Sequence, residues 1–155
     1  MGSSRLPGKV MKPLVGKPMV GRILDRLEKS NLASEIVVVT THKSSDDPLS
    51  DYVKSLNHTV FRGDELDVLD RFYSCAKSLN LDYVVRATGD NPFVDQEEID
   101  RQIEFHLREK LEYSSNFPSL GGSLPFAIGV ETMSFNALEK SWNEGIQPHH
   151  REHVN

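Results

Sequence analysis

Hydrophobic and polar positions along this chain follow two different periods, which predict helices and strands in turn. Apolar residues recur at helical spacing within 17–31, where Pro18 suits the first turn and Asn31 the end of a helix. Residues 36–39 are four consecutive β-branched residues, which predicts a strand buried on both faces, as in a parallel sheet. The residues expected on the inner face of the first helix are Met19, Val20, Ile23, Leu24 and Leu27.

The alternation continues through the middle of the chain. It predicts a turn and short helix within 42–57, a strand at 58–63, a helix within 64–80, a strand at about 82–87 and a helix at about 96–110. Strands that alternate with helices of about a dozen residues indicate βαβ units, so we predict an α/β fold with a mostly parallel sheet. In the helix within 64–80 the residues expected to face inward are Val68, Leu69, Phe72, Cys75, Ala76 and Leu79.

The pattern loosens after Glu112. Glycine, proline and serine dominate the next segment, which we interpret as an excursion or flap. A strand over 126–132 and a last helix over 135–145 follow. The tail, 146–155, shows no structure of its own.

Polar residues follow three of the predicted strands. They are residues 40–41, 62–64 and 88–91. Because ligands of open α/β sheets bind beyond the carboxyl ends of the strands, these residues are candidates for one shared cleft.

Composition narrows the class of protein. A chain of 155 residues is long enough for one domain with a core, and its net charge of −5 argues against nonspecific nucleic-acid binding. The single cysteine, Cys75, excludes an internal disulfide and fits a reducing compartment. No apolar run approaches the ~18 residues of a membrane span, and no signal peptide is recognisable. We therefore expect a cytoplasmic protein without nucleic-acid or membrane partners.

The first residues combine turn formers with positive charge. In "GSSRLPGK" the cations Arg5 and Lys9 flank Gly8, and the free backbone N–H groups of this glycine- and serine-containing turn can cradle a polyphosphate. Lys12 and Lys17 add positive charge nearby. A solvated N-terminus or an expression-tag remnant would have the same composition, and the spacing of a P-loop is absent.

The turn "TGDNP" offers a carboxylate directly after a predicted buried strand. Asp90 is placed there to hold Mg²⁺ near phosphates. The alternative, which the spacing leaves equally open, is that Asp90 and Asn91 only form the turn.

Other chemically suggestive residues have simpler explanations. Asp67 can cap the following helix, and carboxylates at a helix N-terminus are favoured without any metal. Cys75 lies on an apolar helix face and is interpreted as a core residue rather than a nucleophile. A solvated tail explains the three histidines better than a metal site does: His149, His150 and His153.

Four motifs in order are similar to those of one enzyme family. The stretches "GSSRLPGKVMKPLVGKPM", "VFRGDELDVLDRFY", "VVRATGDNPFVD" and "REHV" resemble the cytidylyltransferase-type nucleotide-sugar synthetases. The resemblance is nearest to the spore coat polysaccharide biosynthesis protein F group and more distant to the CMP-Kdo and CMP-sialic acid synthetases. It implies a nucleotidyltransferase fold (Rossmann-like, related to glycosyltransferase-A) with three layers around a mostly parallel sheet. It also implies cytidylyl transfer from CTP to an acidic or other sugar in surface polysaccharide biosynthesis, with Mg²⁺.

The same resemblance assigns roles to residues. Arg5 and Lys9 match the family's triphosphate-binding cations, and Asp90 matches its metal-binding aspartate, so Lys9 and Asp90 are the implied catalytic residues. Arg86 is placed near the base or the phosphates. The backbone of the phosphate loop is matched by Gly2, Ser3 and Ser4. Residues in the segment beside nucleotide and acceptor, with no individual role assigned, are Arg62, Asp64, Asp67 and Arg71.

Two features of the family pattern have no counterpart here. In the family a strand precedes the phosphate loop, and a second acidic metal ligand follows the "REHV" motif. We interpret 1–155 as a single incomplete nucleotidyltransferase domain that lacks the first strand and the C-terminal part. An uncovered strand edge invites association, so we expect poor solubility as a monomer or a tight homodimer.

Two rival functions stay open. One is a catalytically inactive nucleotide-binding fragment, which the missing second carboxylate favours. The other is a glycosyltransferase that uses a nucleotide-sugar donor. Such enzymes usually carry an Asp-x-Asp pair, whereas "TGDNP" has a single aspartate.

Overall fold

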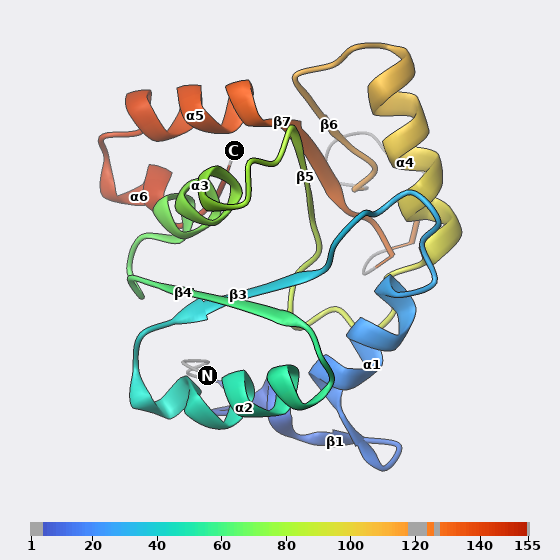
Figure 1. The fold of residues 1–155 in the computed structure, drawn as a ribbon, viewed down its shortest axis with the longest axis vertical. Coiled ribbons are helices and arrows are strands. Elements are labelled where there is room, and N and C mark those ends of the chain that lie inside the picture. The colour runs from blue at the N-terminus through green and yellow to red at the C-terminus, as the bar shows by residue number, and fades with distance from the viewer. Residues whose placement is uncertain (1–4, 118–123, 126–127, 155) are drawn as a thin grey trace. The chain divides into compact units, whose positions relative to one another are not determined.

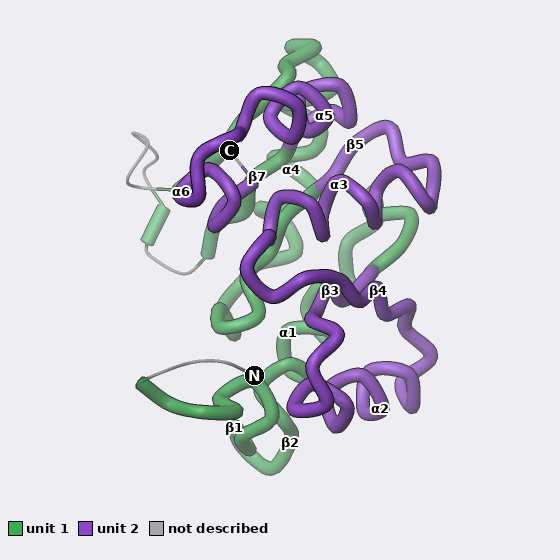
Figure 2. Tube along the Cα trace, turned by 90° about the vertical axis from the view of Figure 1, so that its left-hand side faces the viewer, with its two compact units in different colours: residues 1–36, 85–132 green, residues 37–84, 133–155 purple. Residues whose placement is uncertain are grey.

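The chain divides into two compact units, each assembled from two stretches of sequence. The structure, a computed structural model, describes residues 5–117, 124–125 and 128–154 (Figure 1). The first unit comprises residues 1–36 and 85–132, and the second comprises 37–84 and 133–155 (Figure 2). In chain order the elements are η1 (Lys9–Met11), β1 (Pro13–Leu14), β2 (Lys17–Pro18), α1 (Met19–Leu27), β3 (Val37–Thr41), η2 (Ser44–Asp46), α2 (Asp47–Ser55), β4 (Thr59–Gly63), α3 (Val68–Ser78), β5 (Tyr83–Arg86), α4 (Gln96–Arg108), β6 (Tyr113–Ser115), β7 (Glu131–Ser134), α5 (Phe135–Glu144) and α6 (Pro148–Arg151).

The strands of the described residues form three small sheets. Strands β1 and β2 make an antiparallel hairpin that the sequence did not predict. Strands β3 and β4 pair in parallel, with Val37 opposite Thr59 and Thr41 opposite Gly63. The third sheet has the order β5-β7-β6. The predicted α/β class is confirmed, and the parallel pair lies where strand–helix–strand alternation predicted one.

In the second unit, helices cover the parallel pair from two sides. Both α2 and α3 contact β4, and Figure 1 shows α2 on one side of the β3–β4 pair and α3 on the other. Helix α5 packs against α3. The side chains buried in this unit include Leu49, Val53, Leu69, Met133 and Leu138. This arrangement brings the carboxyl ends of β3 and β4, Thr41 and Gly63, side by side.

The apolar face of α3 differs in part from the prediction. Leu69, Cys75 and Ala76 are buried as predicted, and Tyr73 is buried too although the pattern did not select it. The ring of Tyr73 stacks on Trp142 of α5 with 4.4 Å between centroids, so a helix that follows much later in the chain covers it. Three predicted core residues are only half-buried: Val68, Phe72 and Leu79.

The prediction that the strand at 36–39 is buried on both faces is wrong. Val37, Val38 and Val39 are half-buried, and the full burial begins at Thr40. Among the described residues β3 is hydrogen-bonded to β4 and to no other strand. A strand with one neighbour is shielded less than the central strand that such a run of valines typically forms.

The core of the first unit lies between α1 and α4. The described part of this unit has a cluster formed by Ile23, Val94, Ile99, Ile103 and Val130. Helix α4 begins at the cap residue Asp95, whose carboxylate accepts from the backbone N–H groups of Glu97 and Glu98 at 3.0 and 3.2 Å. This capping ties the start of α4 to the segment that follows the "TGDNP" turn.

Helix α1 ends at Leu27, earlier than the predicted end at Asn31. Past the helix end, Asp100 on α4 binds the chain: its Oδ2 accepts from the backbone N–H of Asn31 at 2.9 Å and from its side-chain amide at 3.2 Å. The Ser30 hydroxyl also donates to this carboxylate. A residue 69 positions away in the sequence therefore holds the segment that follows the helix.

The C-terminal elements correct two further predictions. The strand expected at 126–132 is β7, Glu131–Ser134, and residues 126–127 lie outside the described residues, as does part of the expected excursion after Glu112. The tail is not without structure, because Pro148–Arg151 form the short helix α6. Pro148 suits a first helical position, and Gln147 and His150 form a capping box that closes this turn. None of the helices in the described ranges is long and apolar enough to cross a membrane.

Candidate active site

The predicted phosphate loop folds as a tight turn that leads into η1. The backbone N–H of Lys9 donates to the carbonyl oxygen of Leu6 at 3.1 Å, and that of Met11 donates to Gly8 at 2.9 Å. Gly8 has a φ of 67°, in the left-handed region that favours glycine. Arg5 is exposed. The other predicted residues of this loop, Gly2, Ser3 and Ser4, lie outside the described residues.

The two motifs with the best chemical rationale meet in the first unit. The Nζ atom of Lys9 lies 2.5 Å from Oδ2 of Asp90, across 81 positions of sequence. Gly89 lies against the side chain of Val10, since a Cβ built at Gly89 would be 3.8 Å from Val10 Cγ1. The predicted phosphate loop and the predicted metal turn are therefore neighbours.

The turn around Asp90 is held by its own residues. The N–H of Asn91 donates to the carbonyl of Thr88 at 3.1 Å, and the buried side chain of Asn91 accepts from Phe93 N at 3.2 Å. Asn91 therefore forms the turn, a role that the sequence allowed for Asp90 as well as for Asn91. Asp90 itself points its carboxylate outward, with 48% of the side chain exposed.

The electrostatics of Asp90 favour its ionised form. The hydrogen bond from the Lys9 ammonium lowers the pKa of Asp90, and this effect outweighs the partial burial, which acts in the opposite direction. The Thr88 side chain donates to the same carboxylate and also lowers the pKa. A carboxylate that is ionised, half-exposed and next to a loop cation is suited to bind a cation that arrives with phosphate groups.

Arg86 forms a separate ion pair in the first unit. Its Nη1 atom lies 2.6 Å from Oε2 of Glu131, and both side chains are largely buried. The Tyr113 hydroxyl donates to Oε1 of the same glutamate at 3.2 Å. The sequence analysis missed Glu131 and Tyr113, because the only available signal was a lone glutamate in a predicted strand. This ion pair does not test the predicted position of Arg86 near the base or the phosphates, which stays a prediction.

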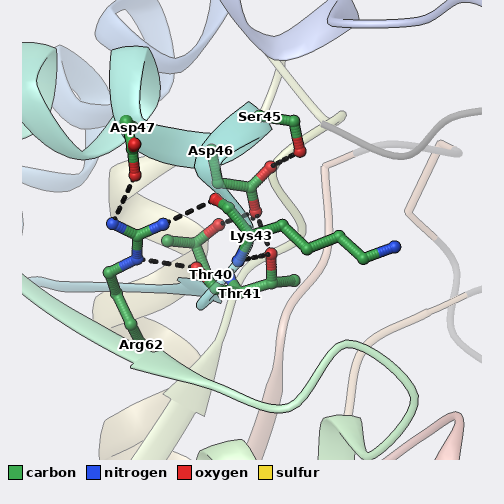
Figure 3. A network of polar contacts seen from close by, with 7 residues as sticks. All are labelled: Thr40, Thr41, Lys43, Ser45, Asp46, Asp47 and Arg62. Atoms are coloured by element: carbon green, nitrogen blue, oxygen red, sulfur yellow. Dashed lines mark hydrogen bonds and ion pairs between the residues drawn. The ribbon is translucent and has the colours of Figure 1, made fainter.

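A second polar network lies at the carboxyl end of β3 in the second unit (Figure 3). The carboxylate of Asp46 is 1% exposed, and its Oδ2 accepts from the hydroxyls of Thr40 and Thr41, both at 2.7 Å. It also accepts from the backbone N–H of Thr41 at 3.1 Å. Burial alone would raise the pKa of Asp46, but these hydrogen bonds outweigh it and hold the pKa well below its usual range. Sequence reasoning selected the threonines and missed Asp46.

Arg62 joins this network from β4. Its guanidinium donates to the carbonyl oxygens of Thr41 and Lys43 and to the carboxylate of Asp47, each at 2.7 Å (Figure 3). Lys43 forms an ion pair with Glu65 in the loop after β4. Arg62 therefore fixes the loop after β3, a role that the sequence could not assign.

The other residues of this segment also have structural partners. Asp64 accepts from Leu66 N at 2.7 Å, and Asp67 caps α3 by accepting from Asp70 N at 2.8 Å, as predicted for Asp67. The stem of Arg71 runs across Gly63, where a Cβ would lie 2.5 Å from Arg71 Cγ. Burial lowers the pKa of Arg71, while the surrounding carboxylates oppose this effect.

No group of three or more metal-ligating side chains occurs among the described residues. His149 and His150 are neighbours on α6, with ring centroids 4.2 Å apart. Cys75 is buried in the second unit, in agreement with its interpretation as a core residue. Asp90, the predicted metal ligand, lies beside Lys9, the predicted phosphate-binding cation.

The sequence is similar to one described protein family and to several known proteins. Residues 1–144 match the family described as cytidylyltransferase. The uncharacterized protein MJ1063 of Methanocaldococcus jannaschii is 39% identical over 99% of this chain. The spore coat polysaccharide biosynthesis protein SpsF of Bacillus subtilis is 33% identical over 99% of the chain. A more distant match is 3-deoxy-manno-octulosonate cytidylyltransferase of Hahella chejuensis, which is 38% identical over 62% of the chain and 38% of its own length.

A solved structure supports the same fold. A cytidylyltransferase from Leptospira borgpetersenii superposes with a TM-score of 0.93 at 32% identity, over 99% of this chain. The chain spans 65% of the length of that structure. It spans 61% and 64% of the Methanocaldococcus and Bacillus relatives. The predicted nucleotidyltransferase fold and the resemblance on which it rested are confirmed.

Proposed function

This chain belongs to the cytidylyltransferase family, and we propose that it binds CTP and takes part in cytidylyl transfer to an acidic or other sugar in surface polysaccharide biosynthesis. The two units would act as one nucleotidyltransferase domain, and the family match, which runs through both of them, supports this proposal. The names of the Bacillus and Hahella relatives support the class of product, a nucleotide-activated sugar for a polysaccharide.

The observation that carries the proposal is the contact between Lys9 and Asp90. A triphosphate needs a cation for its terminal phosphates, and a divalent metal needs a carboxylate close to those phosphates. Both motifs come from distant parts of the sequence, and each has a structural explanation when taken alone. Their meeting at one point of the first unit favours the functional explanation for both.

The reaction requires little covalent work from the protein. An oxygen of the acceptor sugar forms a bond to the α-phosphorus of CTP, the bond from that phosphorus to the β-phosphate bridging oxygen breaks, and pyrophosphate leaves. The hydroxyl proton of the acceptor passes to solvent. Lys9, with Arg5, would orient the β- and γ-phosphates and stabilise the charge that grows on pyrophosphate.

The residues at Asp90 fit a bound Mg²⁺. This ion is held in proteins by one or two carboxylates together with substrate phosphates rather than by a complete protein cage. Asp90 supplies one ionised, half-exposed carboxylate beside the phosphate loop, which meets that requirement. When bound, the ion neutralises charge on the phosphates.

The proposal extends to a homodimer in the cytoplasm. Strand β3 has its only described strand partner in β4, and Val37–Val39 are half-buried, so its other edge could pair with a second copy. Multi-angle light scattering tests the dimer. A monomer that unfolds cooperatively would contradict it.

A nucleotide-selectivity assay tests the proposed function. The chain is incubated with Mg²⁺, one of CTP, UTP, ATP or GTP, and a panel of acidic and neutral sugars, and pyrophosphate release is measured. We expect release with CTP and an acceptor above the level without an acceptor. Equilibrium dialysis with labelled CTP, run in parallel, measures binding. A chain that neither binds CTP nor releases pyrophosphate contradicts the proposal.

One observation favours a second candidate function. Among the described residues, Asp90 is the single predicted metal-binding carboxylate, and no group of three metal-ligating side chains surrounds it. A nucleotide-binding chain without turnover would fit this composition. CTP binding in dialysis without pyrophosphate release for any acceptor would identify it. Hydrolysis of a CDP-sugar with no use of CTP would instead indicate a glycosyltransferase.

A further inference from the structure

The ion pair of Lys9 and Asp90 joins two groups that the proposed function needs apart. Resting on that function, we propose that Lys9 competes with the divalent metal for the Asp90 carboxylate and keeps this site closed until nucleotide phosphates draw the ammonium away. Lys9 would thus be a built-in counter-ion that makes metal binding depend on the nucleotide.

The ammonium group of Lys9 lies against the Asp90 carboxylate, where a metal cation would bind. Lys9 Nζ lies 2.5 Å from Asp90 Oδ2, and the lysine side chain is 27% exposed. Mg²⁺ would need an oxygen of the same carboxylate at about 2.0–2.1 Å. An ammonium and a divalent ion at one carboxylate repel each other, so the two occupants exclude one another.

The backbone on both sides keeps the two side chains close together. The turn at Gly8 and the hydrogen bond from Lys9 N to Leu6 O fix the start of the lysine side chain. Gly89 lies against Val10, which fixes the other side. Only the flexible lysine stem needs to move for the pair to open, and such a side-chain motion is fast compared with catalysis.

Lys9 is the cation of the first unit that the structure pairs with Asp90. Other described cations of this unit have carboxylate partners elsewhere, and among them Lys17 pairs with Asp25, Arg26 with Asp95 and Arg86 with Glu131. The Lys9 hydrogen bond is also the largest influence that lowers the pKa of Asp90. Removing Lys9 should therefore change the cation affinity of Asp90 more than removing any distant charge.

The consequence is a sequence of binding events. Metal alone should bind weakly, because it must displace Lys9 from Asp90. Phosphates of the nucleotide attract the ammonium, which vacates the carboxylate at the moment when the metal–nucleotide complex arrives. Substitution of Lys9 by a neutral residue is thus expected to affect the two ligands in opposite directions, which no purely structural role predicts.

Mn²⁺ binding without nucleotide tests this inference. The full chain is titrated with Mn²⁺, and free Mn²⁺ is measured by electron paramagnetic resonance. We expect Lys9→Met to bind Mn²⁺ about threefold more tightly or better, the size expected when a partly exposed ion pair is lost. Lys29→Met, which removes an exposed charge of the same unit after α1, should leave the affinity unchanged. Asp90→Asn should weaken Mn²⁺ binding, and Lys9→Met added to it should produce no gain.

Dialysis with CTP and Mg²⁺ separates this inference from the proposed function. We expect Lys9→Met to weaken CTP binding while it strengthens Mn²⁺ binding. Equal or weaker Mn²⁺ binding by Lys9→Met overturns the inference even if the wild-type chain binds CTP. Absence of CTP binding by the wild-type chain overturns the proposed function. Circular dichroism of each variant shows whether it is folded, and Lys9→Gln replaces Lys9→Met if the latter is not.

Discussion

The side chain of Arg71 crosses Gly63 so closely that a Cβ at Gly63 would lie 2.5 Å from Arg71 Cγ. The end of β4 therefore needs glycine for a reason of space rather than of backbone conformation. The atom in the way belongs to the root of the arginine stem, whose Nε is buried, so it cannot simply swing aside. This contact places Arg71 beside the strand end at which the polar network of the second unit lies.

We expect Gly63→Ala to lower the free energy of unfolding by about 1–3 kcal/mol, the usual range for overpacking. Urea unfolding followed by circular dichroism measures this change. Gly89→Ala is the matched control, because its Cβ would make an ordinary contact with Val10 at 3.8 Å. Equal stability of the two variants would show that Arg71 moves without cost.

Asp46 is expected to stabilise the loop after β3 through its charge. Asp46→Asn keeps the volume but replaces a charged acceptor of the Thr40 and Thr41 hydroxyls by a neutral amide. We expect a loss of about 1–2 kcal/mol in the free energy of unfolding, because hydrogen bonds to a charged group are the stronger ones. Asp47→Asn removes the charge of an exposed partner of Arg62 and should cost less than about 1 kcal/mol.

The low pKa of Asp46 also predicts an acid transition. Its pKa is lower in the folded than in the unfolded chain, so the folded state binds fewer protons. The stabilisation is therefore present above the unfolded pKa of about 3.9 and is lost as the pH falls below it. Urea unfolding at pH 6, 4 and 3 should show that the free energy of unfolding falls more steeply with decreasing pH for wild type than for Asp46→Asn. The difference arises because the unfolded wild-type chain binds up to about one more proton than the folded chain, at Asp46. Parallel losses in the two proteins would contradict this prediction.

His106 on α4 should add a second pH dependence, in a milder range. It is fully buried, its Nδ1 lies 2.8 Å from the Ser114 hydroxyl, and burial lowers its pKa. Protonation therefore favours the unfolded chain, and stability falls as the pH drops below the unfolded pKa of about 6.5.

The slope contributed by His106 is at most about 1.4 kcal/mol per pH unit, the value for one proton. We expect His106→Gln to remove this slope between about pH 6.5 and pH 5. His42→Gln, at an exposed position, should leave it in place. Unfolding curves of both variants at three pH values in that interval measure the slopes. Equal slopes in His106→Gln and wild type would contradict the prediction.

Activity should depend on both members of the Lys9–Asp90 pair. We expect Lys9→Ala and Asp90→Ala each to lower CTP-dependent pyrophosphate release by about 100-fold or more, the size seen when one group that stabilises transition-state charge is removed. Lys29→Ala, far from the pair in sequence, is the control. Near wild-type turnover in either variant would remove that residue from the proposed site.

Local signals in the sequence predicted the elements well, whereas their ends depended on distant residues. Asp67 was correctly expected to cap α3, because a cap acts within one turn of its own helix. The predicted end of α1 at Asn31 was wrong, and Asn31 instead binds Asp100 on another helix through its backbone, a contact that no local signal indicates. The half-burial of Val37–Val39 was missed for a related reason, since burial of a strand depends on which strands lie beside it.

By itself, the sequence determined the α/β class, the core character of Cys75 and the two stretches that resemble a phosphate loop and a metal turn. These follow from periodicity and short motifs, which are local properties of the chain. Only the tertiary structure decided that Lys9 meets Asp90 and that Asp46 and Arg62 organise the end of β3. Such contacts join residues far apart in sequence or in different elements, and their strength depends on burial and distance. Neither quantity exists until the chain has folded.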